Sequence, residues 1–65
     1  MNELDVVKLI RPFKGLEVGI KGTIVHKYNS HNFEVEFFDQ NNESIDVFTI
    51  ESSYLELVWK FNEIK

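Results

Sequence analysis

Three carboxylates in the middle of the chain are the side chains best placed to act together. Glu34 and Glu36 alternate with apolar residues, and Asp46 lies in a second alternating run that follows a turn of Gln and Asn. The segment Phe33–Ile50 therefore predicts a β-hairpin. In the register we expect, Glu36 lies opposite Asp46 on the outer face, although like charges facing each other on a sheet are mildly unfavourable. The carboxylates then form either an ordinary solvated face or a surface kept for a partner.

Two aromatic residues join the carboxylates on this outer face. With Asp39 paired to Glu43, counting every second residue puts Phe38 and Phe48 on the solvent side, with Phe48 opposite Glu34. Exposed aromatic residues beside charges often mark an interaction patch. The alternative is that a bulge in the second hairpin strand turns Phe48 and Ile50 inward and leaves only Phe38 outside. The candidate partner-binding residues are Glu34, Glu36, Phe38, Asp46 and Phe48.

Reaction chemistry has little support in the sequence. His26 is predicted within a strand and His31 in a turn, and neither has a partner at a telling spacing. The serines lack the motif of an activated nucleophile. The carboxylates could hold a hard cation by adjacency, but all-carboxylate sites normally recruit loop carbonyls as well. We expect no enzymatic activity, no metal site and no cofactor.

The size and composition indicate a single small cytoplasmic domain. A chain of 65 residues buries only about 60% of the surface that it exposes when unfolded. It contains no cysteine, so disulfides cannot stabilise it, and its first residues carry no basic and apolar leader. No run of residues reaches the length of a membrane span. We expect one domain over residues 1–65, located in the cytoplasm and independent of membranes.

The charge pattern favours a basic protein as partner. Eleven acidic residues outnumber seven Lys and Arg, and the formal net charge is −4. Proteins that bind a phosphate backbone normally present clustered cations, whereas here only a weak basic region forms in the first third of the chain, at Lys8, Arg11, Lys14 and Lys21. The region from Glu34 to Glu56 is acidic, and complementary potentials favour encounter with a basic partner. Nucleic acid is therefore the less favoured partner.

Five short strands are predicted to position these residues. They cover residues 4–10, about 20–28, 33–37, about 43–50 and 54–61, with a long loop after the first and a short helical turn before the last. Gly15 and Gly19 suit positive φ in the loop, and Gly22 predicts a bulge or a sharp bend. A helix is the alternative for the last ten residues.

The first of the two hairpins sets which residues point inward on the second strand. With Tyr28 opposite Phe33, Ile24 and His26 point into the core, and Lys27 lies beside Glu34. Lys27 would then partly neutralise the acidic face.

Together these elements predict an all-β fold, a small five-stranded SH3-like barrel with a Gly-rich bend like that of KOW elements. Closing a five-stranded sheet needs glycine or bulges at the corners, and closure removes most of the exposed edge. Residues 58–65 form a C-terminal extension of the single domain.

Three short motifs resemble a family of short, uncharacterised bacterial proteins, a domain of unknown function. They are Asp5-Val6-Val7, the stretch Gly19–Val25, and Val35-Glu36-Phe37 followed by Asp39. The resemblance covers residues 3–57, and it departs from the family pattern at Asn42, where the family tends to place glycine. Asn can still adopt the left-handed conformation at modest cost.

The resemblance implies an SH3-like barrel and a role in toxin immunity. Some members of the family are encoded beside toxin-like genes, which suggests an immunity protein or antitoxin that binds a basic toxin domain, such as a nuclease, and blocks it. The alternative is a KOW-like RNA- or ribosome-associated module that uses the basic region. A further alternative is a weak dimer, rather than a monomer, that forms through Trp59 and Phe61 of the last strand.

Overall fold

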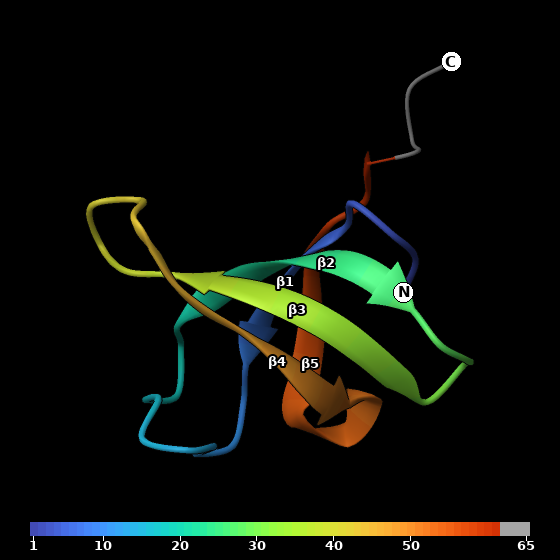
Figure 1. Cartoon of the computed structure of the whole chain (residues 1–65), viewed down its shortest axis with the longest axis horizontal. Helices are drawn as coiled ribbons and strands as arrows, with labels where there is room; N and C mark the ends of the chain where they lie inside the picture. The colour runs from blue at the N-terminus through green and yellow to red at the C-terminus, as the bar shows by residue number, and fades with distance from the viewer. Residues whose placement is uncertain (62–65) are drawn as a thin grey trace.

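The computed structural model describes residues 1–61 and shows five antiparallel strands (Figure 1). The strands form one sheet in the order β4-β3-β2-β1-β5, and one turn of 3₁₀ helix, η1, connects β4 to β5. Their bounds are Val6–Leu9 for β1, Lys21–Lys27 for β2, Asn32–Phe38 for β3, Ser44–Glu51 for β4, Ser52–Tyr54 for η1 and Leu55–Trp59 for β5. Among these residues no helix has the length and apolar character needed to cross a membrane.

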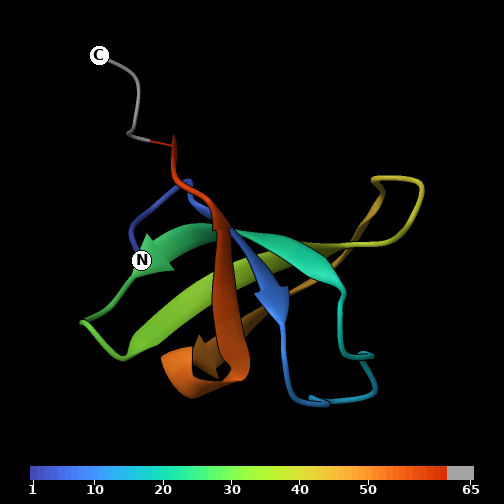
Figure 2. The ribbon, with the colours of Figure 1, turned by 180° about the vertical axis from the view of Figure 1, so that it is seen from behind.

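The sheet curls into a small barrel-like fold with the core between its two layers. β3 and β4 lie in front of β1 and β5 in Figure 1 and behind them in Figure 2. The predicted all-β, five-stranded architecture is confirmed, including the helical turn before the last strand. The C-terminal strand predicted over 54–61 is confirmed over Leu55–Trp59, so the helix alternative is wrong there. Tyr54 belongs to η1, the strand ends at Trp59, and the predicted extension at 62–65 lies outside the described residues.

The core takes inward-facing residues from all five strands. On β3 the burial alternates as predicted, because strand side chains point to opposite faces in turn. Eight hydrophobic side chains of residues 1–61 are buried: Val7, Leu9, Ile24, Phe33, Val35, Phe37, Ile50 and Leu55. Phe13 and Leu16 of the long loop pack against this core, and Gly15 and Gly19 have the positive φ values predicted for them.

The predicted register between β3 and β4 is wrong because the pairing contains a bulge next to Phe37. The irregularity lies between Phe37 and Phe38, so Glu36 pairs with Val47 and Asp46 pairs with Phe37. One inserted residue reverses which side chains face inward. Phe48 therefore pairs with Val35 and turns toward the core, as the bulged alternative predicted.

The register between β2 and β3 also differs from the predicted one, because β2 contains a second bulge. Val25 is left out of the pairing, Ile24 pairs with Val35, and His26 pairs with Glu34 on the exposed side. His26 is therefore not a core residue. Lys27 pairs with Phe33 and not with Glu34, and its side-chain amine donates a hydrogen bond to Asn2. The bulge lies at Val25 rather than at Gly22, which is instead a point of close contact between β2 and β3.

Candidate functional site

The outer face of the sheet is the candidate functional surface, because one continuous row of side chains crosses all its strands. The row follows from the four strand pairings, each of which places the next residue directly opposite the last. From β5 to β4 it contains Trp59, Val6, Thr23, Glu36 and Val47. The neighbouring row contains Glu56, Lys8, Lys21, Phe38 and Ser44. The first row thus runs from Trp59 on β5 to the acidic face of β3, with Val6 and Thr23 between Trp59 and Glu36.

The structure brings together three of the five predicted partner-binding residues. Glu34, Glu36 and Phe38 alternate on the outer face of β3, and all three are half-buried. Asp46 lies on β4, where its Oδ1 accepts a hydrogen bond from the Val47 N–H at 2.7 Å. Phe48 packs inward, so the candidate patch consists of the three β3 residues.

Aromatic contacts explain the inward position of Phe48. Its ring centroid lies 5.7 Å from that of Phe13 in an edge-to-face arrangement and 6.4 Å from that of Phe37. Edge-to-face pairs are a favoured arrangement of aromatic rings. Phe48 therefore joins the long loop to the core and does not face a partner on the outer side of the sheet.

The two carboxylates on β3 differ in their surroundings. Glu34 Oε1 accepts a hydrogen bond from the Tyr28 hydroxyl at 3.2 Å, and Glu34 pairs with His26 across the strands. Among the described residues the Glu36 carboxylate forms no hydrogen bond or ion pair, and it lies between Thr23 and Val47. Glu36 is thus a half-buried acid whose charge is not neutralised within the described part of the domain.

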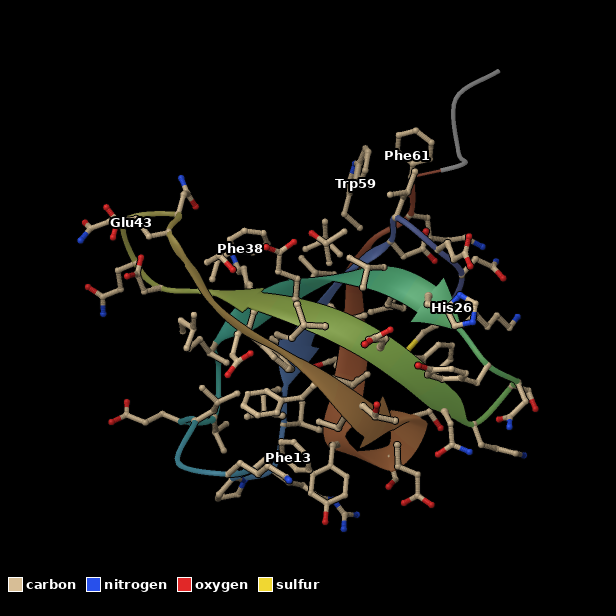
Figure 3. All side chains as sticks on the ribbon, in the orientation of Figure 1. Phe13, His26, Phe38, Glu43, Trp59 and Phe61 are labelled. Carbon is tan, nitrogen blue, oxygen red and sulfur yellow. The ribbon has the colours of Figure 1, made fainter. Side chains whose placement is uncertain are left out.

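The charges of the chain are divided between its two halves. Residues 28–59 contain no Lys or Arg, whereas the residues before them contain five. The seven acidic residues of this span are Glu34, Glu36, Asp39, Glu43, Asp46, Glu51 and Glu56. The β3–β4 hairpin is therefore strongly negative, and Glu43 lies at its tip (Figure 3).

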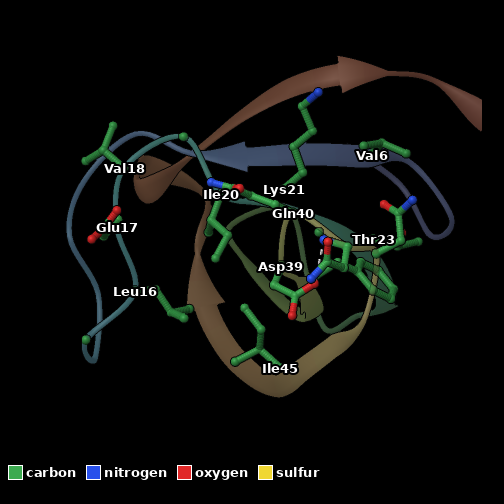
Figure 4. A pocket seen from close by; sticks show the side chains of 16 residues that line it. Val6, Leu16, Glu17, Val18, Ile20, Lys21, Thr23, Asp39, Gln40 and Ile45 are labelled. Atoms are coloured by element: carbon green, nitrogen blue, oxygen red, sulfur yellow. Dashed lines mark hydrogen bonds between the residues drawn. The ribbon is translucent and has the colours of Figure 1, made fainter.

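A groove of about 1190 Å³ adjoins the patch and shares Phe38 with it. One side is formed by the loop around Leu16, Glu17 and Val18, and the other by the β3–β4 turn together with Ile45 of β4 (Figure 4). Lys21 and Thr23 of β2 also line it. Its lining is mixed, with aliphatic side chains together with carboxylates, amides and one lysine, which suits an extended polypeptide better than a small apolar ligand.

The groove was not predicted from the sequence. Strand alternation alone places Thr23 on the outer face with Phe38. The loop after β1 and the β3–β4 turn approach each other, however, only because the sheet curls, and no local sequence pattern predicts that approach.

A separate cluster combines cations with aromatic rings beneath the barrel. The Arg11 guanidinium lies 5.9 Å from the Tyr54 ring centroid. The Lys14 amine lies 5.8 Å from the Phe13 centroid and 6.0 Å from that of Phe48. Cations within about 6 Å of a ring are attracted by its negative face. Two members of the predicted basic region are therefore placed against aromatic side chains.

The two histidines have ordinary surface environments. His26 Nδ1 lies 3.4 Å from Glu3 Oε2, and both side chains are about half exposed. His31 lies in the β2–β3 turn, where its backbone N–H donates to Asn29. Within residues 1–61 no group of three His, Cys, Asp or Glu side chains is arranged to hold a metal ion.

Comparison with protein families gives a match to a domain of unknown function, DUF4926, over residues 3–57. The chain belongs to this family. The DUF4926 segment contains β1 to β4 and most of β5, so it includes the acidic patch and the groove. It ends before Trp59, which therefore lies in the extension predicted at 58–65. No curated protein and no solved structure matches the chain.

Proposed function

We propose that this DUF4926 domain is a cytoplasmic protein-binding module that binds and neutralises a cognate toxin with a basic surface, such as a nuclease. The observation that carries the proposal is the half-buried Glu36 carboxylate, which lacks a neutralising partner among the described residues. Glu34 and Phe38 flank it on the same face. A cationic side chain of a partner would supply the missing charge, and such complementarity speeds association and selects partners.

The mode of neutralisation is substrate mimicry. A nuclease holds the phosphates of its substrate with cations, and carboxylates on a rigid strand can occupy the same positions. Glu34 and Glu36 are two residues apart on β3 and thus about 7 Å apart along it. Phe38 and the adjoining groove add apolar area, which the acidic pair alone does not provide. The sequence contains no cysteine, which suits the reducing cytoplasm, and the domain acts as a monomer or weak dimer.

The test is a double charge reversal, Glu34→Lys with Glu36→Lys, measured with a candidate toxin, that is, a basic protein that co-purifies with the domain. We expect the association rate at low salt to fall about tenfold or more, because electrostatic steering is reversed at the contact face. Stopped-flow association and inhibition of the toxin are the measurements.

The matched control is Glu3→Lys with Glu56→Lys, which changes the net charge equally at positions away from the patch. Its cost is small, since the contacts that it breaks are all exposed: the Lys8–Glu56 ion pair, the His26–Glu3 contact and a 3.4 Å hydrogen bond from the Lys27 N–H to Glu3. If both double variants slow association equally, net charge rather than the β3 face governs binding. If neither does, the proposed site is wrong.

A second candidate function, RNA binding, is favoured by the cluster of Arg11 and Lys14 over aromatic rings. RNA-binding surfaces interleave aromatic residues, on which bases stack, with cations that neutralise phosphates. Of the other two cations in the predicted basic region, Lys8 pairs with Glu56 at 3.5 Å, and Lys21 lines the groove.

For this candidate we expect a single-stranded RNA to be retained in a filter-binding assay at low salt. Retention should fall at least severalfold in the Arg11→Ala, Lys14→Ala double variant, because fewer phosphates are neutralised. Absence of retention by the unaltered protein rejects RNA binding.

A further inference from the structure

The outer edge of β4 is an open strand edge in the described chain. β4 ends the strand order, and its pairing with β3 is continuous from Asp46 to Glu51. An edge strand presents unpaired N–H and C=O groups that can bind another strand. A long, regular edge is therefore a potential binding surface.

Hydrogen-bond alternation identifies which backbone groups point outward. The Ser52 N–H donates to the His31 carbonyl at 2.8 Å, and hydrogen-bonded pairs alternate along an antiparallel ladder. The next such pairs are Phe33 with Ile50 and Val35 with Phe48. The N–H and C=O groups of the residues between them, Val47, Thr49 and Glu51, consequently point away from the sheet.

Asp46 covers the first of these outward groups. Its Oδ1 accepts the Val47 N–H at 2.7 Å, which satisfies that donor within the domain. An incoming strand that takes over the Val47 N–H releases the Asp46 carboxylate, which can then pair with a cation of the incoming strand. The arrangement protects the edge in the free domain and contributes charge when the edge is occupied.

The opposite edge of the sheet, β5, is less suited to accept a strand. β5 has five residues, and its pairing with β1 shifts between Val6 and Val7, so that Val58 has no partner in the register. Short, bulged edges are among the ways proteins prevent edge-to-edge pairing. β4 has eight residues, and its irregularity lies near its start, so its regular part from Asp46 to Glu51 is longer than any regular part of β5.

Charge decides what the β4 edge can accept. Asp46 and Glu51 lie on β4, Glu43 directly precedes it, and residues 28–59 contain no Lys or Arg. A second copy paired along β4 would bring these acids against each other, and like charges facing each other across strands are unfavourable. A strand that carries Lys or Arg meets the opposite charge.

We infer that the β4 edge binds an extended, basic segment of the partner as an added strand. This inference rests on the proposed function and specifies how the partner is held. In strand addition the backbone hydrogen bonds supply affinity, and alternate side chains supply specificity. Here Val47 and Thr49 contact the incoming strand from the outer face, next to the acidic patch on β3.

The first test uses an eight-residue peptide of alternating lysine and valine, the length of β4, with both termini capped so that they carry no charge. A peptide of alternating glutamate and valine is the control. Amide hydrogen exchange of the domain is followed by NMR. The lysine peptide should slow exchange at Val47, Thr49 and Glu51 at least tenfold, and the glutamate peptide should leave it unchanged. Unaltered exchange at these three amides with the lysine peptide overturns the inference.

The second test compares Thr49→Pro with Thr49→Val. Proline removes the outward N–H of Thr49 but no hydrogen bond to β3, and an edge strand tolerates proline at such a position. Valine keeps the N–H. We expect Thr49→Pro to bind the lysine peptide about tenfold more weakly than Thr49→Val, as loss of one backbone hydrogen bond predicts.

Two results separate this inference from the proposed function. Equal binding by both Thr49 variants overturns strand addition. If the toxin-like partner still loses affinity in the Glu34→Lys, Glu36→Lys variant, the partner binds the face of β3 alone and the proposed function stands. If Thr49→Pro does not fold, exchange protection in the unaltered domain decides the question.

Discussion

Gly22→Ala is expected to cost about 3 kcal/mol of folding free energy, because there is no room for a Cβ atom at this position. A Cβ atom on Gly22 would lie 2.7 Å from Val35 Cγ1, 2.8 Å from the Glu36 carbonyl oxygen and 3.0 Å from Phe37 Cδ1. The carbonyl belongs to the β2–β3 ladder and cannot move without disturbing it. A domain of this length has a total stability of about 3–10 kcal/mol. Urea denaturation should therefore show a large loss of stability or an unfolded protein.

Gly15→Ala is the matched control for this prediction. Gly15 has a φ of +82°, but no atom lies within 4 Å of the point that an alanine Cβ would occupy, so the cost is confined to the backbone conformation. That cost is about 1 kcal/mol. A loss of stability in Gly22→Ala no larger than in Gly15→Ala would show that β2 and β3 can separate at Gly22 without penalty.

The features predicted correctly are those that local chemistry determines. The inward alternation of Phe33, Val35 and Phe37 follows from the period of a strand. Gly19 and Asn42 adopt positive φ, as their residue types predict. Each of these depends on one residue or on its nearest neighbours, which a single sequence displays.

The two bulges account for the errors at the candidate site, because the sequence offers the one next to Phe37 only as an alternative and indicates the other at Gly22 instead of Val25. An extra residue at Val25 turns His26 outward, and the irregularity next to Phe37 moves Asp46 away from Glu36 and Phe48 into the core. A bulge is selected by how the curled sheet packs, so neither hairpin sequence reports it alone. The like-charge pairing expected between Glu36 and Asp46 is thereby avoided.

The bulge next to Phe37 also separates the two acidic features that the proposals use. Glu36 remains on the outer face of β3, whereas Asp46 moves to the free edge and satisfies the Val47 N–H. A basic partner that adds a strand at β4 and lies over β3 would contact both. Because of the register shift, the acidic residues do not form the single predicted cluster. They lie partly on the outer face of β3 and partly on the free edge of β4, and separate variants can test binding at each.

Asp5→Asn is the second substitution expected to destabilise the domain strongly, by about 2 kcal/mol. The Asp5 side chain is buried, and each of its oxygens accepts a different backbone N–H. Oδ2 accepts from Asn2 at 2.8 Å and Oδ1 from Phe61 at 3.0 Å, so one carboxylate joins the first turn of the chain to the segment after β5. Asparagine retains one acceptor oxygen, and its NH₂ group then faces an N–H donor.

Asp39→Asn separates this effect from the loss of a negative charge. Asp39 uses a single oxygen, Oδ1, to accept both the Asn41 and the Glu43 N–H groups, and asparagine can keep both bonds. We expect Asp39→Asn to change the free energy of unfolding by less than about 1 kcal/mol. In Asp5→Asn, amide exchange at Phe61 should also accelerate, because that N–H loses its acceptor. If the two variants are equally stable, the buried Asp5 carboxylate contributes no more to folding than the Asp39 carboxylate in the turn. The hydrogen bond from Phe61 to Asp5 would then not hold the segment after β5 in place.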